Sequence, residues 1–396
     1  QRSLKFSNYL KDYGWEPIVL TVENGPDKTI EHELLDEVRS DIHVERVSFL
    51  SNVVARKIAH FLRFFINEPR TIEGVDWRLR RLWKFPDIYA LWRPTAVKRA
   101  LALFEEEGFD CIYATGAPWT SFLVARDLAR KTGKPFILDY RDLWTSWESG
   151  WDNSSRVARW FMRHLEINIL KDASAVITVS ESLVIALKAM LKADSKKQVS
   201  CITNGYDPVD FLVEPTKRES LGKVRIVYTG VWKKGYSPAV LYEALKTLQS
   251  EFSNEFNLLE VFCAGFHPGP ALQYGLSKNV IELGRVGHNE AIALMKSADL
   301  LYLPVADGEY AIGSLPGKFF EYLASAKPMI SAVPEESRVG GAVRVEPRDV
   351  TALVNLLVEV AQAGGPNWGA PNPEKITCFE RINLTSHLAE VLTSVT

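Results

Sequence analysis

The sequence is poor in cysteine, and its four cysteines lie 62 to 115 residues apart without any CxxC pair. Such spacing is atypical of zinc sites and of disulfide frameworks, so it favours a reducing compartment. The seven histidines are equally scattered, with no HExxH or HxH motif. We therefore expect neither a metal ion nor a cofactor.

Long hydrophobic runs are also absent. No stretch of 18 predominantly apolar residues could span a bilayer, and we expect no signal peptide before the fold. We expect a cytoplasmic protein with at most peripheral contact with the inner face of the cytoplasmic membrane. The chain begins at Gln1 within a helical pattern (2–14), so a first strand and its loop are expected upstream.

The chain has no large excess of either charge, because 47 basic and 49 acidic residues leave a net charge of −2. This balance argues against a globally basic, nucleic-acid-binding protein. Residues 54–99 nevertheless hold eleven Lys and Arg, four Asp and Glu, and eight aromatic residues. The segment suits an anionic membrane or a polyprenyl-diphosphate-linked acceptor, unless its apolar residues pack in a core. The candidate acceptor or membrane contacts are Arg78, Arg80, Arg81, Trp83 and Trp92.

Apolar, β-branched runs alternate with helical patterns along the chain, which predicts an α/β fold with parallel sheets covered on both faces. One such helical pattern is 118–133, where Gly133 is placed to end the helix. Twelve strands are expected, at 16–22, 43–49, 110–115, 135–140, 174–179, 199–203, 224–230, 258–265, 279–284, 299–305, 328–333 and 342–346.

The strand pattern is interrupted at 207–223 by two prolines, a glycine and mixed charge. This interruption predicts a domain boundary, and hence two doubly wound, Rossmann-like domains facing each other across a cleft. We expect an N-terminal domain over 1–210 and a C-terminal domain over 220–375. A final amphipathic helix within 376–396 is expected to cross back to the first domain.

The segment GSLPGKFFEYLASAKPMI (313–330) carries the clearest chemistry. Ser314 is expected to cap a helix whose first turn holds Pro316, and free amides at such a helix start bind anions. Lys318 adds a positive charge, and Glu321 could accept hydrogen bonds from a ribose diol. The pattern indicates a nucleoside diphosphate site; the alternative is a surface Lys–Glu pair.

Four further segments could line a site at strand ends. In 224–245, Lys233 and Lys234 could reach a diphosphate or could simply be solvated. In 135–147, Arg141 and Asp142 follow a buried strand, although Arg141 could instead be the structural partner of an aspartate. The remaining two are the Asn-Gly turn of TNGYDP (203–208) and the glycine loop of IELGRVGHNEA (281–291), whose backbone could bind a base edge.

These segments together resemble the GT-B glycosyltransferases of family 4, particularly bacterial enzymes of polysaccharide and lipopolysaccharide assembly. The resemblance is carried, in order, by DYRDLW, ITNGYDP, VYTGVWKKG, LGRVGH with ADLLYLPV, GSLPGKFFEYLASAKPMI and FERINLTSHLAEVL. It implies acceptor binding by the first domain, nucleotide-sugar binding mainly by the second, and transfer with retention of anomeric configuration.

The resemblance also implies roles for single residues. Glu321 matches the ribose-binding glutamate, and the implied catalytic residues are Asp142, Arg141, Lys318 and Lys234. The implied donor-binding residues are Gly313, Ser314, Leu315, Pro316 and Gly317 at the diphosphate, Arg285 and Val286 at the base, and in addition Gly230 and Asn204. Two positions depart from the family: Gly313 stands where a second glutamate is common, and Val231 where an arginine is frequent.

The sequence therefore predicts a retaining hexosyl or N-acetylhexosaminyl transferase. Its donor would be a nucleotide-sugar, with UDP favoured, and its acceptor a lipid-linked or growing glycan in bacterial surface polysaccharide synthesis. Two alternatives stay open. One is a nucleotide-sugar epimerase of the same fold, and the other is a non-catalytic nucleotide-sugar-binding partner in an assembly complex.

Overall fold

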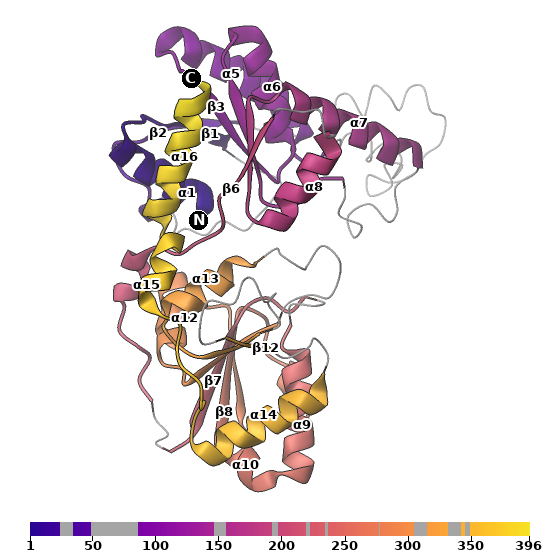
Figure 1. Ribbon diagram of the computed structural model, residues 1–396, viewed down its shortest axis with the longest axis vertical. Helices are drawn as coiled ribbons and strands as arrows, with labels where there is room; N and C mark the ends of the chain where they lie inside the picture. Colours follow the sequence, from indigo (N-terminus) through magenta and orange to yellow (C-terminus); the bar gives the residue numbers. More distant parts are fainter. Residues whose placement is uncertain are drawn as a thin grey trace. The chain divides into compact units, whose positions relative to one another are not determined.

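The computed structural model describes residues 1–23, 35–48, 86–145, 156–191, 197–218, 222–233, 237–276, 278–304, 315–331, 342–344 and 349–396. The chain forms two compact units (Figure 1). The first comprises Gln1–Ile202 together with Thr385–Thr396, and the second comprises Thr203–Leu384.

Each of the twelve predicted strands is present, and every pairing between them is parallel, as expected. In the first unit they form two sheets. One pairs β1 (Ile18–Val22) with β2 (His43–Val47); the other has the order β3 (Ile112–Gly116), β4 (Phe136–Tyr140), β5 (Ala175–Thr178) and β6 (Gln198–Cys201). All residues of β4 and β5 are buried, so their near-continuous apolar sequences reflect helices on both faces.

The helices of the first unit are α1 (Arg2–Leu10), α5 (Arg93–Glu106), α6 (Thr120–Thr132), α7 (Arg156–Asp172), α8 (Glu181–Leu191) and, from Thr385 onward, α16 (Arg381–Val395). Short 3-10 helices span η1 (Lys11–Tyr13) and η3 (Ala90–Trp92). Gly133 ends α6 in the left-handed conformation with φ 73°, which confirms its predicted role.

A buried ion pair ties α1 to the four-stranded sheet. Arg2 Nε and Nη2 lie 3.0 and 3.1 Å from the carboxylate oxygens of Asp139 in β4. The Tyr113 hydroxyl donates to the same carboxylate at 2.5 Å, and Arg2 Nη2 also donates to the Ile202 carbonyl at 2.9 Å. Three donors thus satisfy a carboxylate that has no solvent exposure.

The second unit contains one six-stranded sheet with the order β12-β11-β10-β7-β8-β9. Its strands are β7 (Val224–Thr229), β8 (Leu259–Ala264), β9 (Val280–Gly284), β10 (Leu300–Leu303), β11 (Met329–Ser331) and β12 (Ala342–Arg344). This is the strand order of a Rossmann sheet, and the chain reverses direction across the sheet between β7 and β10.

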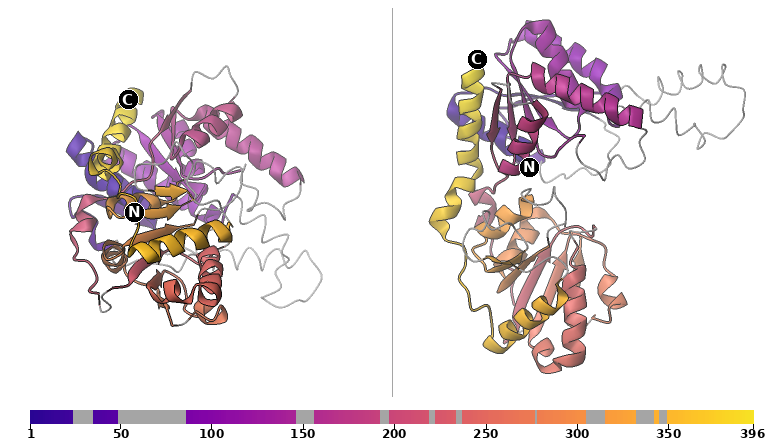
Figure 2. Two further views of the ribbon diagram at one scale, coloured as in Figure 1. Left: turned by 60° about the horizontal axis from the view of Figure 1, so that its bottom comes forward. Right: turned by 45° about the vertical axis from the view of Figure 1, so that its right-hand side comes forward.

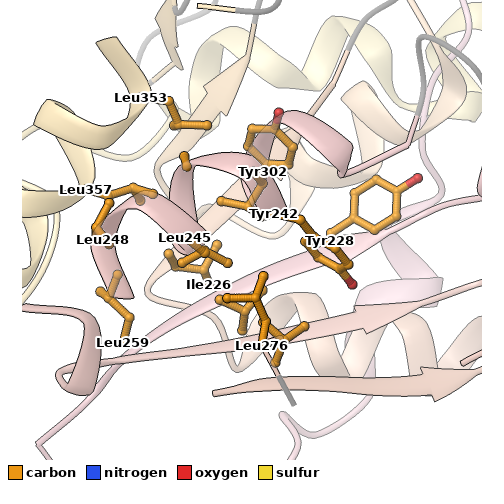
Figure 3. Packing of buried hydrophobic residues seen from close by; sticks show 14 of the residues in the cluster. Ile226, Tyr228, Tyr242, Leu245, Leu248, Leu259, Leu276, Tyr302, Leu353 and Leu357 are labelled. Carbon is orange, nitrogen blue, oxygen red and sulfur yellow. The ribbon is translucent and has the colours of Figure 1, made fainter. Parts of the chain in front are cut away.

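Helices cover both faces of this sheet. On one face, Ile226 and Tyr228 pack with α9 (Ala239–Glu251), α10 (Ser253–Asn257) and α14 (Val350–Ala363), as Figure 3 shows for α9 and α14. Val227, between them in β7, faces the opposite layer with α12 (His288–Lys296) and α13 (Gly317–Ala324). Shorter helices are η5 (Pro208–Leu212), α11 (Pro270–Gln273), α15 (Pro373–Ile376) and η7 (Thr377–Phe379).

Within the described ranges, none of the helices combines the length and the apolar composition that crossing a bilayer requires.

Candidate functional site

The candidate site lies in the second unit, at the carboxyl ends of β7 and β10. Doubly wound sheets bind ligands where the strand order reverses, and these two strands are the neighbours at that point. The chain leaves β7 at Gly230, and α13 is the helix that follows β10. The VYTG and LPGKFFEYLA segments, which the sequence singled out separately, therefore meet at one edge of one sheet.

Glycines end β7, β8 and β9, and their backbones pack closely. Gly230 donates its N–H to the Ala264 carbonyl at 2.8 Å, and Gly265 donates to the Gly284 carbonyl at 2.7 Å. Gly265 adopts φ +107°, and a Cβ on it would come within 2.4 Å of the Gly230 carbonyl oxygen. Position 265 requires glycine because of its positive φ and because its backbone lies so close to Gly230. At these strand ends the site is therefore bordered by backbone atoms.

The amino terminus of α13 differs from the expectation. The helix begins at Gly317 with Pro316 as its N-cap, and no side-chain hydrogen bond caps it. The predicted cap by Ser314, with Pro316 in the first turn, is therefore wrong. Leu315 and Pro316 are half-buried and Gly317 is exposed, and the Phe319 N–H in the first turn donates to the Pro316 carbonyl at 2.9 Å. Gly313 and Ser314 lie outside the described residues.

Lys318 and Glu321 form an ion pair within α13. Lys318 Nζ lies 2.8 Å from Glu321 Oε2, with 33% of the lysine side chain exposed and only 9% of the glutamate. The pair is thus not the surface Lys–Glu pair of the alternative interpretation. A buried carboxylate that keeps acceptor capacity beyond one ammonium group can bind further hydroxyl donors.

Tyr322 holds α13 against the end of β7. Its hydroxyl accepts a hydrogen bond of 2.9 Å from the Thr229 backbone N–H, one residue before Gly230. Burial raises the pKa of Tyr322 above its ordinary value, so the phenol remains neutral and polar. Phe319 and Phe320 pack into the core beside it, and the position of Lys318 and Glu321 is fixed by these contacts.

The sequence analysis missed two residues of the candidate site. His288, the first residue of α12, lies with its Nε2 3.2 Å from Asp210 Oδ2 in η5. The hydrogen bond to Asp210 raises the pKa of His288, the Glu321 carboxylate raises it further, and burial and Lys318 oppose the rise. His288 belongs to the LGRVGH segment that was singled out, but nothing in the sequence pairs it with a residue 78 positions earlier.

Asp210, His288, Lys318 and Glu321 are called the α12–α13 cluster below. They come from η5, α12 and α13, and they interact electrostatically. Two bases and two acids at a helix amino terminus can bind an anion, accept hydrogen bonds from hydroxyls and hold a proton on the imidazole.

The remaining predicted donor-binding residues lie on two other segments. Arg285 is exposed and Val286 is half-buried on the loop that leads into His288, with Val286 packed against the core under α13. Asn204 is half-buried between β6 and η5. Its neighbour Gly205 is required by packing, because a Cβ there would lie 2.1 Å from the Phe379 carbonyl oxygen.

The two lysines of the loop after β7 are only partly described. Lys233 is exposed, and the Val231 carbonyl two residues before it accepts a hydrogen bond of 3.0 Å from the Tyr228 hydroxyl. Lys234 lies outside the described residues.

In the first unit, Arg141 binds backbone rather than an aspartate. Its Nε donates to the Gly116 carbonyl at 3.1 Å and its Nη2 donates to the Ala117 carbonyl. Asp142 is half-buried beside it, in the loop that follows β4. That loop is anchored at Thr145, whose N–H and hydroxyl both donate to Glu166 of α7.

Trp92 does not offer an acceptor or membrane contact. Its side chain is 9% exposed and packs in a core with Ala96, Val124 and Leu128. An indole ring is largely apolar, so the core of the first unit retains it. The other candidates of that segment, Arg78, Arg80, Arg81 and Trp83, lie outside the described residues.

No group of three or more His, Cys, Asp or Glu side chains is arranged to hold a metal ion in the part of the chain that the structure describes.

Comparisons with known proteins agree with this architecture. Residues 3–200 match the model of the glycosyl transferase 4-like domain, and residues 223–363 match the model of glycosyl transferases group 1. A search of curated protein sequences gives no significant match.

Solved structures give the fold. A sucrose-phosphate synthase from Thermosynechococcus elongatus is similar with a TM-score of 0.62 and 16% identity, over 99% of this chain and 87% of that chain. Anabaena HepE, in complex with UDP, has a TM-score of 0.57 and 14% identity, over 95% and 99%. The lipopolysaccharide outer core galactosyltransferase WaaB in its apo form has a TM-score of 0.54 and 14% identity, over 95% and 99%.

Proposed function

The chain belongs to the glycosyltransferases with a glycosyl transferase 4-like domain and has their GT-B fold, and we propose that it is a retaining enzyme with a UDP-sugar donor. The acceptor is a lipid-linked or growing glycan in bacterial surface polysaccharide synthesis. The sugar is a hexose or N-acetylhexosamine.

The observation that carries the proposal is the buried Glu321 beside Lys318 at the start of α13. A carboxylate in this position can accept hydrogen bonds from both hydroxyls of a ribose. The diphosphate then meets the Lys318 ammonium and the Gly317 and Lys318 backbone amides at the amino terminus of α13. The reversal of strand order between β7 and β10 is where such a sheet binds nucleotides.

Two of the similar structures support the choice of donor and acceptor. HepE is in complex with UDP, which supports a uridine nucleotide here. WaaB is a lipopolysaccharide outer core galactosyltransferase, which supports a surface glycan as acceptor.

Sugar transfer requires stabilisation of the negative charge that develops on the leaving diphosphate. The bond between the sugar and the diphosphate breaks, a bond to an acceptor hydroxyl oxygen forms, and negative charge develops on the diphosphate. We assign the stabilisation of this charge to Lys318, the α13 amides and Lys234, because preorganised donors lower a reaction barrier most where charge develops. Asp142 is assigned to positioning the sugar or the acceptor, since retention in this class needs no protein nucleophile.

The test is to measure UDP binding and sugar transfer for Lys318→Ala and Glu321→Ala. We expect each to lose at least tenfold in UDP affinity, because each removes a charge-assisted contact to donor. Lys246→Ala and Glu251→Ala are matched controls on exposed surface of the same unit. Wild-type UDP affinity and turnover in both site variants, with unchanged thermal unfolding, would refute the assignment.

The His288–Asp210 pair is the one observation that favours an epimerase instead. An imidazole held by a carboxylate is a general acid or base, and it lies electrostatically close to Glu321. Incubation with UDP-sugars without acceptor separates the two functions, because an epimerase interconverts sugars while a transferase releases UDP only when acceptor is added. Binding of UDP with neither outcome would indicate a non-catalytic binding partner.

A further inference from the structure

The first two turns of α7 expose an unusual surface. Val157, Trp160 and Phe161 are 75%, 61% and 53% exposed, although large apolar side chains of this kind are ordinarily buried. Arg156, Arg159 and Arg163 are exposed on the same turns. These six residues are called the α7 face, and α7 runs along the outside of the first unit (Figure 2).

The α7 face is divided into an apolar and a basic strip. Val157 and Phe161 are four positions apart and share one side of the helix. Arg159 and Arg163 share another side, and Trp160 lies between the two strips. The first carboxylate on α7 is Glu166, which is buried and engaged by Thr145.

A groove of about 250 Å³ adjoins the α7 face. Phe161 and Leu165 line it from α7, and Arg93, Arg126 and Arg130 line it from α5 and α6. Two aspartates accompany these three arginines, Asp127 with Arg93 and Asp172 with Arg126 and Arg130. Groove and α7 face together hold six arginines; counting Asp127 and Asp172 against them leaves an excess of four positive charges in a chain whose net charge is −2.

We propose that the α7 face docks on the surface of a bilayer that contains anionic lipid. Trp160, Phe161 and Val157 enter the headgroup region, where amphipathic aromatic rings are most stable, and the arginines bind lipid phosphates. The apolar and basic strips lie side by side, which is the arrangement that an interfacial helix uses when its axis is parallel to the membrane.

The charge pattern separates this partner from a second copy of the chain. A two-fold contact would place the α7 face against itself, so arginines would oppose arginines. An anionic surface neutralises all of them at once. The proposal does not depend on transferase activity, although docking would bring a lipid-linked acceptor to the enzyme.

The test is co-sedimentation of the full chain with vesicles. We compare phosphatidylcholine alone with phosphatidylcholine that contains one third phosphatidylglycerol, at low and high salt. Wild type should bind the anionic vesicles only, and less at high salt, because screening weakens the attraction. The double variant Trp160→Ala with Phe161→Ala should lower the partition coefficient at least tenfold. Substitution of any one arginine of the α7 face by glutamate should lower it about fivefold or more.

Matched variants control for folding and net charge. Arg156→Glu with Arg159→Glu is compared with Lys246→Glu and Lys278→Glu, the same charge change on exposed residues of the second unit. Leu272→Ala, at a residue that is 71% exposed, controls for loss of an apolar side chain. The controls should bind vesicles as wild type does.

Three outcomes would overturn the proposal: no binding by wild type, equal binding to neutral vesicles, or unaltered binding by the α7 variants. A change in oligomeric state of the α7 variants without vesicles would assign the face to protein contact instead. UDP binding is measured in parallel and should be unchanged in every α7 variant. Vesicle binding without UDP binding would contradict the proposed function alone, and the reverse would contradict only the membrane proposal.

Discussion

The imidazole of His288 lies 3.2 Å from the carboxylate of Asp210, and this contact ties η5 to the amino terminus of α12. A protonated histidine is unfavourable at a helix amino terminus, since both carry positive charge. Asp210 offsets that repulsion and raises the pKa of His288. Protonation of the imidazole beside the Lys318–Glu321 pair is thereby favoured.

The first prediction is that this contact stabilises the protein only while His288 is protonated. Because its pKa is raised on folding, the contribution is complete below the unfolded pKa and is lost as pH rises through the folded pKa. Asp210→Asn should therefore cost about 1 kcal/mol of unfolding free energy near pH 5.5 and little near pH 9. Urea unfolding at the two pH values measures this. An equal loss at both would show that the charge is irrelevant.

The second prediction concerns Glu166, whose buried carboxyl has its pKa raised to about 7 from 4.5, mainly by burial. A raised pKa means that the proton stabilises the folded state below pH 4.5 and that this stability is lost as pH rises through 7. The loss is roughly 3 kcal/mol. Glu166→Gln cannot ionise, so it should not lose this stability and should be more stable than wild type near pH 9.

Urea unfolding across pH measures this difference. Glu105→Gln, an exposed residue of α5, is the control and should follow wild type. A Glu166→Gln curve parallel to that of wild type would contradict the prediction. Because Glu166 holds Thr145, a shift of the loop that carries Asp142 should accompany its ionisation.

The third prediction concerns Arg2 and Asp139. Arg2→Met leaves a carboxylate buried with only the Tyr113 hydroxyl to stabilise it, and should cost about 3–5 kcal/mol of unfolding free energy. Arg130→Ala, which breaks an exposed ion pair with Asp172, should cost less than about 1 kcal/mol. Arg2→Lys should fall between them, because it restores the charge without the two-pronged geometry. Similar losses for Arg2→Met and Arg130→Ala would refute this ranking.

The fourth prediction concerns the glycines at the strand ends of the site. Gly265→Ala would place a Cβ 2.4 Å from the Gly230 carbonyl oxygen, so the ends of β7 and β8 must move apart. Gly275 has a comparable positive φ of +75° with no atom within 4 Å of the added Cβ. Gly275→Ala should therefore cost only about 1 kcal/mol for backbone strain, and Gly265→Ala should cost several times more and also lower UDP affinity. Thermal unfolding and UDP titration of both variants make the comparison.

The strands could be predicted because buried parallel strands need continuous apolar, β-branched residues, and such runs are visible without any knowledge of their neighbours. Gly133 was predictable for a similar reason, since a helix end with positive φ depends on one residue. The burial of Glu321 was not, because a Lys–Glu spacing of three fits an exposed helix face equally well. It depends on how Phe319, Phe320 and Tyr322 pack against strands far away in the sequence.

The errors have a common physical origin. The Ser314 cap was inferred from local preference, whereas the helix starts at Gly317 with Pro316 as its N-cap. Trp92 was grouped with a basic segment by composition, but the packing of α5 and α6 around it decides its burial. His288 and Asp210 are joined only by the folded chain, so spacing along the sequence could not reveal them.

Residues 385–396 belong to the first unit, although residues 203–384 of the second unit intervene. The Ser394 hydroxyl donates to Gln198 at 3.3 Å, and Leu388 and Leu392 are buried. During translation, residues 1–202 leave the ribosome long before residues 385–396, which pack in the same unit. The second unit is continuous in sequence and can finish folding first. The unit whose synthesis begins first is therefore the unit whose folding ends last.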